Sequence, residues 1–129
     1  MTDPIADMLI RIKNAQMVSK EETVVPFSNI KYEIAKILEK KGFIAEAKKF
    51  GQKTEKIIKI SLSYKNDTPA ITNVKRISKP GQRIYKTVNE IRPIRGGYGI
   101  GIISTSKGIM TIKQAQKKNL GGEVIAEIW

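Results

Sequence analysis

Two stretches near the N-terminus repeat apolar residues every three or four positions, and this spacing predicts two amphipathic helices. The first follows Thr2-Asp3-Pro4, a capping sequence whose proline suits the first helical turn, and its apolar residues run from Ile5 to Ile12. Ser28 can cap the second helix, which we expect to continue to about Lys41. Each helix would bury one face.

Short runs of alternating apolar and polar residues predict strands between and after these helices. In the first half of the chain we expect strands at residues 23–26, 43–49 and 56–64. The sequence Gly51-Gln52-Lys53 would join the last two as a hairpin turn. The first half therefore predicts an α-β-α-β-β lobe of the α/β (more narrowly α+β) class, with helices on one face of a sheet.

The polar segment Lys65-Asn66-Asp67-Thr68-Pro69 ends in proline and predicts a turn or short linker between two small lobes. We expect an N-terminal lobe over residues 1–65 and a C-terminal lobe over residues 70–129. The second lobe would be mostly β, with strands at 71–78, 83–86, 100–103, 109–110 and 123–129.

One short helix is expected in the second lobe, from Ile112 to Asn119, capped by Thr111 and ended by the glycines that follow Leu120. Simple alternation in the last strand would place Val124, Ala126 and Ile128 on one face.

Positive charge is the strongest compositional signal. The 129 residues hold 24 Lys and Arg against 12 Asp and Glu, a net charge of +12. Residues 68–129 carry 11 basic and 3 acidic side chains, whereas residues 1–67 carry 13 and 9, so the excess lies mainly in the second half. A basic globular chain of this kind usually binds a polyanion, above all a nucleic acid.

Several function classes lack the residues they need. The chain has no cysteine and no histidine, which removes thiol nucleophiles, thiolate metal sites and the commonest general base. There is no apolar run long enough to span a membrane and no signal-peptide pattern. We therefore expect a cytoplasmic protein without a metal, a cofactor or a membrane partner.

The stretch Ser104-Thr105-Ser106-Lys107-Gly108 is the main candidate site, because it places three hydroxyls and a lysine between two apolar runs. Such a turn suits phosphate and ribose recognition. The alternative is that the hydroxyls only satisfy the backbone of the turn. The nearby Arg83-Ile84-Tyr85-Lys86 could hold a base or sugar, although Tyr85 could equally pack on the sheet.

The spacing of glycines and lysines does not match the motifs of nucleotide-dependent enzymes. The glycines of residues 96–101 do not form the G-x-G-x-x-G fingerprint, and Lys107 is followed by Gly108 where a P-loop needs Ser or Thr. A nucleotide-dependent enzyme using Lys107 is therefore disfavoured. A DNA-binding regulator remains open.

Four segments together resemble the family of the bacterial eighth protein of the small ribosomal subunit; these are residues 3–9, 83–85, 104–111 and 120–124. The resemblance implies a structural constituent of the small subunit, without catalysis, that binds the central domain of small-subunit rRNA and helps its assembly. It also implies neighbouring ribosomal proteins as partners and a monomer outside the ribosome. Action on DNA or mRNA as a regulator is the alternative.

The resemblance also implies the RNA-binding residues. The principal loop would be Ser104, Thr105, Ser106, Lys107 and Gly108, with Tyr85, Gly121, Gly122 and Glu123 beside it. Its positive charge makes Lys86 a further candidate RNA-binding residue. A secondary contact would comprise Thr2, Pro4, Arg11, Lys13 and Asn14. Glu123 would contact a base amino group or orient a basic side chain, and Lys75, Arg76 and Arg83 would add to the positive field.

Two positions depart from the family's pattern. Ile112 stands where an acidic residue is usual, which affects the electrostatics of the last helix's first turn. Lys13 stands where arginine is common, so the charge is kept and the bidentate geometry is lost.

Overall fold

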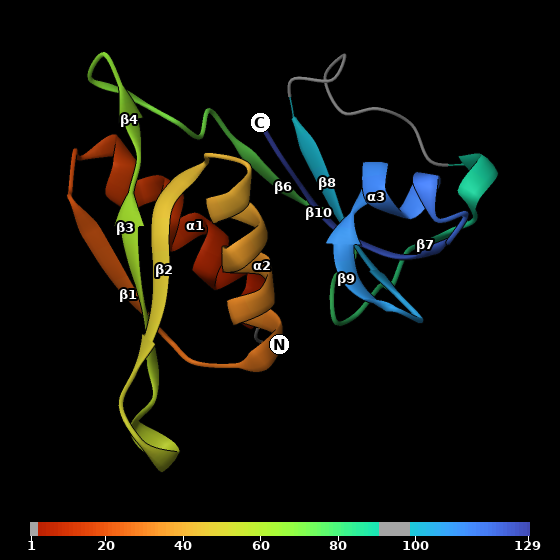
Figure 1. The fold of residues 1–129 in the computed structure, drawn as a ribbon, viewed down its shortest axis with the longest axis horizontal. Coiled ribbons are helices and arrows are strands. Elements are labelled where there is room, and N and C mark those ends of the chain that lie inside the picture. Colours follow the sequence, from red (N-terminus) through yellow and green to blue (C-terminus); the bar gives the residue numbers. More distant parts are fainter. Residues whose placement is uncertain (1–2, 91–98) are drawn as a thin grey trace. The chain divides into compact units, whose positions relative to one another are not determined.

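A computed structural model describes residues 3–90 and 99–129 of the chain. Their contacts divide the chain into two compact units: Ile5–Thr72, and Asn73–Trp129 together with Met1–Pro4. Each unit has one main antiparallel sheet and at least one helix (Figure 1). The mixed α/β class expected from the sequence is confirmed.

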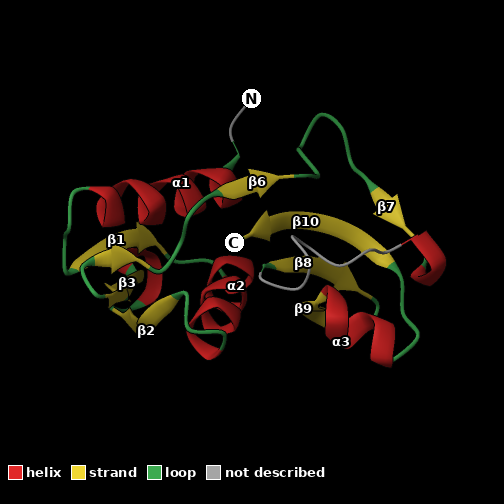
Figure 2. Ribbon diagram, turned by 90° about the horizontal axis from the view of Figure 1, so that it is seen from above, coloured by secondary structure: helices red, strands yellow, loops and turns green. Residues whose placement is uncertain are grey.

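The first unit is a three-stranded sheet with both helices on one face, as Figures 1 and 2 show. Its main elements are α1 (Pro4–Met17), β1 (Glu22–Pro26), α2 (Asn29–Lys40), β2 (Ile44–Phe50) and β3 (Ile57–Leu62). The strand order is β1-β3-β2. This is the α-β-α-β-β arrangement that the pattern predicts.

The core of this unit follows from the two periodicities. Along β3 every second residue is buried, which puts Ile58, Ile60 and Leu62 on the face that the helices cover. The helices contribute Met8, Leu9, Ile12, Ile34 and Leu38, all at most 1% exposed. The Ser28 side chain accepts a hydrogen bond from the Lys31 N–H at 3.2 Å, so the expected N-cap of α2 is confirmed.

Two connections differ in detail from the sequence expectation. A short 3-10 helix, Lys53–Glu55, stands in the connection where a simple hairpin turn is expected. The predicted strand 56–64 ends at Leu62, and Tyr64–Lys65 (β4) pairs with Thr68–Pro69 (β5) in a separate small hairpin. Asn66 and Asp67 have positive φ angles of 52° and 62°, which form the tight turn that such a hairpin requires.

The second unit is a five-stranded antiparallel sheet with one short helix against it (Figure 2). The strands are β6 (Val74–Arg76), β7 (Tyr85–Lys86), β8 (Ile100–Thr105), β9 (Gly108–Thr111) and β10 (Gly122–Ile128), and the helix is α3 (Ile112–Lys117). β10 pairs with β6, β7 and β8, so the last strand of the chain organises this sheet. The mostly β lobe with one short helix is confirmed.

A bulge in β10 overturns the expectation that Val124, Ala126 and Ile128 share a face. Val124 pairs with Ile103, but Ala126 pairs with Ile102, because the register shifts by one residue between them. Paired residues point to the same side of a sheet, whereas consecutive residues point to opposite sides. Val124 therefore lies on the face opposite to Ala126, and Ile125 is the extra residue.

The expected strand 71–78 forms only over Val74–Arg76. The backbone N–H groups of Ile77 and Ser78 both donate to the Ile125 carbonyl, at 3.0 and 3.4 Å, so the regular ladder ends at the bulge. Ser78 then turns inward and is fully buried.

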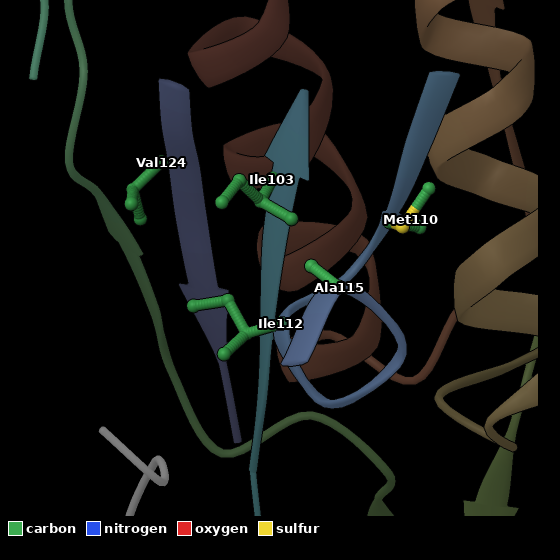
Figure 3. Close-up of a cluster of buried hydrophobic side chains, with 5 residues drawn as sticks. All are labelled: Ile103, Met110, Ile112, Ala115 and Val124. Carbon is green, nitrogen blue, oxygen red and sulfur yellow. The ribbon is translucent and has the colours of Figure 1, made fainter. Parts of the chain in front are cut away.

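A compact apolar cluster joins α3 to the sheet (Figure 3). Ile103 of β8 lies between Val124 of β10 and Met110 of β9, and α3 adds Ile112 and Ala115. All five side chains are at most 7% exposed. The cluster packs β8, β9 and β10 together, and the ends of these strands carry most of the polar residues described below.

Candidate nucleic-acid interface

Polar and basic residues from three strands meet at one end of the second sheet. We call this the strand-end surface, and it consists of Tyr85, Lys86, Ser104, Thr105, Ser106, Lys107, Gly108, Gly121, Gly122 and Glu123. The register brings them together: Glu123 pairs with Tyr85 on one side and with Ser104 on the other. These three residues form a row across β7, β10 and β8, and Tyr85 is 67% exposed.

The β8–β9 turn is held by its own threonine. The Thr105 hydroxyl accepts a hydrogen bond from the Lys107 N–H at 3.1 Å and donates to the Gly108 carbonyl at 2.9 Å. Gly108 has a φ of +112°, a backbone conformation that residues with a side chain rarely adopt. The hydroxyl of Thr105 and the glycine therefore shape the loop, as the structural alternative expects.

The other polar groups of the turn are available. Within the described residues, the side-chain hydroxyls of Ser104 and Ser106 and the ammonium group of Lys107 have no hydrogen-bond or ion-pair partner. Ser106 and Lys107 are exposed, and Ser104 is half-buried. A rigid turn thus presents two hydroxyls and one mobile positive charge to solvent.

Glu123 is fixed by a small polar network. One carboxylate oxygen, Oε2, accepts hydrogen bonds from the Ser78 hydroxyl at 2.5 Å and from Arg83 Nη1 at 2.9 Å. The same Ser78 hydroxyl accepts from the Ile84 N–H at 3.1 Å. Burial alone would raise the pKa of Glu123, but donation from Ser78 and Arg83 and the charges of Arg83 and Arg76 lower it overall. Glu123 therefore orients a basic side chain.

Glu123 should make stability depend on pH in the acid range. Its folded-state pKa is lowered, so its contribution is fully present above its unfolded pKa, about 4.3, and is lost as the pH falls through the folded-state value. We expect Glu123→Gln to cost about 1–3 kcal/mol at neutral pH and less in acid. Urea unfolding of both proteins across this range measures the difference. A cost that stays the same at every pH would contradict the assignment.

Two adjacent glycines let β10 pass between its neighbours at this end. A Cβ on Gly121 would lie 2.6 Å from the Lys86 carbonyl oxygen and 3.0 Å from Thr87 Cα. A Cβ on Gly122 would overlap the Ser104 carbonyl oxygen and lie 3.2 Å from Thr105 Cα. These are backbone atoms that cannot rotate away, so close strand approach accounts for both glycines.

A shallow pocket of about 390 Å³ adjoins the surface, lined by Tyr85, Lys86, Thr87, Glu90, Gly121 and Gly122. Glu90 Oε1 accepts from the Thr87 N–H at 3.0 Å and from the Thr87 hydroxyl at 2.9 Å. These two bonds and the charge of Lys86 lower the pKa of Glu90 against a small effect of burial. Thr87, Glu90 and Ser78 were not predicted as site residues, because none stands in a recognisable motif.

α1 places only some residues of the predicted secondary contact on one side of the helix. Pro4, Arg11 and Asn14 lie within about 80° of one another around the helix axis, but Lys13 lies about 160° from Arg11. The Arg11 guanidinium donates to the Val24 carbonyl and to Asp7, both at 3.1 Å, while staying exposed. Thr2 lies outside the described residues. Helix geometry thus separates Lys13 from the others.

The basic residues around this surface include exposed lysines and one arginine that is fixed by hydrogen bonds. Lys113, Lys117 and Lys118, in and just after α3, are exposed, as is Lys75. Arg76 is different: it binds Asp3 at 3.0 Å and the Ile125 carbonyl at 2.6 Å, and its side chain is 9% exposed. Arg76 therefore has a structural role in tying Asp3 to β6, and its charge is largely balanced.

The described residues contain neither a metal-binding cluster nor a membrane-spanning helix. Among residues 3–90 and 99–129, no group of three or more acidic, His or Cys side chains is placed to hold a metal ion. In the same ranges, none of the helices is long and apolar enough to cross a membrane.

Comparison with known proteins gives a consistent result. The family model of ribosomal protein S8 matches residues 3–129. The chain is 55% identical over 129 residues to small ribosomal subunit protein uS8 of Mycoplasmopsis pulmonis, covering all of this chain and 98% of the relative. It is 51% identical over 130 residues to the uS8 protein of Enterococcus faecalis and 50% identical over 129 residues to that of Dictyoglomus turgidum, again covering all of this chain and 98% of each relative.

The match spans both units and includes every described residue of the strand-end surface. Identities near one half over the full length leave no room for a different fold family. The chain belongs to the ribosomal protein S8 family.

Proposed function

We propose that this protein binds the central domain of small-subunit rRNA directly, through the strand-end surface, and helps the small subunit to assemble. As a member of its family it is a structural, non-enzymatic component of the small ribosomal subunit, and so acts in the bacterial cytoplasm. The choice of the central domain, the residues in contact and a monomeric state outside the ribosome are part of the proposal, as are contacts with neighbouring small-subunit proteins.

The observation that carries this proposal is the row Tyr85, Glu123 and Ser104 beside the exposed Ser106 and Lys107. A-form RNA has a deep, narrow major groove, so proteins read it through 2′-hydroxyls, phosphates and the bases of irregular regions. Short hydroxyls on a rigid turn suit that task, and an exposed tyrosine can stack on an unpaired base. An irregular rRNA helix is therefore the ligand that fits this surface best.

α1 supports a second, weaker contact in the same proposal. Pro4, Arg11 and Asn14 share one side of the helix, and the Arg11 guanidinium keeps an exposed face while bonded to Asp7 and Val24. A guanidinium fixed in this way can still contact a phosphate at little further entropy cost. Lys13, on another side, would meet RNA only if the nucleic acid wrapped around the helix.

Ser106→Ala tests the main contact. The variant removes one exposed hydroxyl without touching the bonds that hold the turn, and we expect affinity for the irregular rRNA helix to fall by about 1–3 kcal/mol. Filter binding or fluorescence anisotropy with the isolated rRNA helix measures the change. Ser61→Ala on β3 is the matched control and should bind as the parent does. Unchanged affinity of a folded Ser106→Ala protein would remove Ser106 from the interface.

Competition between structured RNA and duplex DNA decides the class of nucleic acid. We expect the rRNA helix to displace DNA at all salt concentrations tested, because we expect the hydroxyls of Ser104 and Ser106 to bond the ribose 2′-hydroxyls that DNA lacks. Preference for the duplex DNA would instead support a DNA-binding regulator. The salt concentration must be stated with each affinity, since every phosphate contact makes binding salt-dependent.

A further inference from the structure

Three lysines and two aromatic rings of the first unit form a second basic feature, which we call the lysine–aromatic cluster: Phe27, Tyr32, Lys36, Lys49 and Lys56. The two rings are 5.9 Å apart between centroids. Lys49 Nζ lies 5.9 Å from the Phe27 ring centroid and 5.5 Å from that of Tyr32. Lys36 Nζ is 5.4 Å from the Tyr32 centroid, and Lys56 Nζ is 5.6 Å from that of Phe27.

Local structure explains how these residues meet. Phe27 precedes the α2 cap, and its N–H donates to the Lys56 carbonyl at 3.1 Å, which joins the segment before α2 to the start of β3. Tyr32 and Lys36 are four residues apart and so share a face of α2. Lys49 pairs with Ile58, two residues beyond the buried Ala47, and therefore points to the face of the sheet that the helices cover.

The cluster has more positive charge than its surroundings balance. Lys36 pairs with Glu39 at 3.3 Å, but Glu39 also accepts the Ala47 N–H at 2.7 Å. Burial alone would lower the pKa of Lys36, but the hydrogen bond to Glu39 and the negative charge of Glu39 raise this pKa overall. Lys36 therefore stays protonated. Lys49 and Lys56 are exposed and have no carboxylate partner in the described part of the chain.

Holding three ammonium groups around two rings costs Coulomb energy, and an anion would relieve that cost. The rings keep the lysine stems in place through cation–π attraction, which lowers the entropy lost on binding. Ammonium groups bind phosphate as point charges and read no base sequence.

We propose that the lysine–aromatic cluster binds phosphate groups of an RNA strand, as a second and sequence-independent site apart from both the strand-end surface and the α1 contact. The site rests on the proposed function only in taking RNA as its polyanion. It makes the first unit an RNA-binding module in its own right.

Amide NMR of the intact protein titrated with a short oligouridylate reads this site directly. We expect the amide signals of Phe27, Tyr32 and Lys49 to shift. Lys49→Gln/Lys56→Gln should weaken the affinity obtained from these shifts by roughly fivefold for each lysine at about 0.1 M salt, hence by about 25-fold in the double variant. Lys49→Arg/Lys56→Arg should retain the affinity, since it keeps both charges.

Lys40→Gln/Lys65→Gln is the matched control, because it removes two exposed lysines of the same unit outside the cluster. Equal effects of the two glutamine pairs would overturn the proposal, as would shifts confined to the strand-end surface. A loss of affinity for a polyglutamate peptide with RNA binding unchanged would assign the cluster to an acidic protein segment and also overturn it.

Ser106→Ala and Lys49→Gln/Lys56→Gln together distinguish this proposal from the proposed RNA contact at the strand-end surface. If Ser106→Ala leaves binding to the rRNA helix intact while the lysine pair controls the oligouridylate shifts, the strand-end assignment fails and the cluster stands. If Ser106→Ala weakens helix binding and the lysine pair changes nothing, only the cluster is rejected.

Discussion

Replacing Gly122 with alanine is expected to weaken both the second unit and its RNA binding. The added Cβ would overlap the Ser104 carbonyl oxygen and press on Thr105 Cα, so β10 and β8 must separate where the polar turn begins. Overpacking of this kind costs about 1–3 kcal/mol, and more where only backbone can move. Because Ser104 and Glu123 are cross-strand neighbours, the same displacement breaks the row that we propose as the RNA contact.

Two measurements check the Gly122→Ala result. Fluorescence of Trp129, the only tryptophan of the chain, follows unfolding of the second unit in urea, and anisotropy follows binding of the rRNA helix. Leu38→Ala serves as a control with a comparable loss of stability, since it opens a cavity in the core of the first unit. It should keep its affinity for the helix under conditions where it is folded. Parent-like stability and affinity of Gly122→Ala would show that the strands can part without cost.

Ile103→Ala is expected to produce the largest loss of stability in the second unit. Ile103 is fully buried and lies between Val124 and Met110, with α3 covering the cluster (Figure 3). Truncation of such a residue removes contacts on both sides and leaves a cavity, which costs about 2–5 kcal/mol. Urea unfolding followed by Trp129 fluorescence gives this value.

Ile103→Val is the graded control and should cost about 0.5–1.5 kcal/mol, because it deletes a single methylene group. A loss below about 1 kcal/mol for the alanine variant would mean that α3 can collapse onto the sheet and fill the space. The predicted difference between the two variants therefore tests whether α3 is rigidly packed.

The elements that the sequence predicts correctly are those specified by neighbouring residues. Ser28 caps α2, and Thr111 with Gln114 forms a complete capping box at α3, because each cap joins groups three residues apart. The β8–β9 hairpin likewise follows from two apolar runs around a turn sequence. The β10 bulge was missed because it depends on the partner strand's register, which alternation within one strand cannot reveal.

The candidate site was predicted in part. The hairpin forms where the pattern predicts it, but its turn is only Ser106 and Lys107, because Ser104 and Thr105 continue β8 and Gly108 begins β9. The register places Tyr85 and Glu123 beside Ser104. The different roles of the hydroxyls in this hairpin follow only from the tertiary structure, in which Thr105 is bonded to Gly108 and Lys107 while Ser104 and Ser106 are not. The Ser78–Glu123–Arg83 network could not be predicted from local pattern, because Arg83 and Ser78 lie 40 and 45 residues before Glu123 in the chain.

Local pattern and charge were sufficient for the fold class, for the polyanion as ligand and for the turn as the main candidate, because helix periods, caps and net charge are properties of short segments or of composition. Tertiary structure alone decided which hydroxyls are available, why Gly121 and Gly122 must lack side chains, and that Lys36, Lys49 and Lys56 meet around two rings. These features depend on which strands pair and at what distance. Such pairing is set by the packing of residues far apart in the chain.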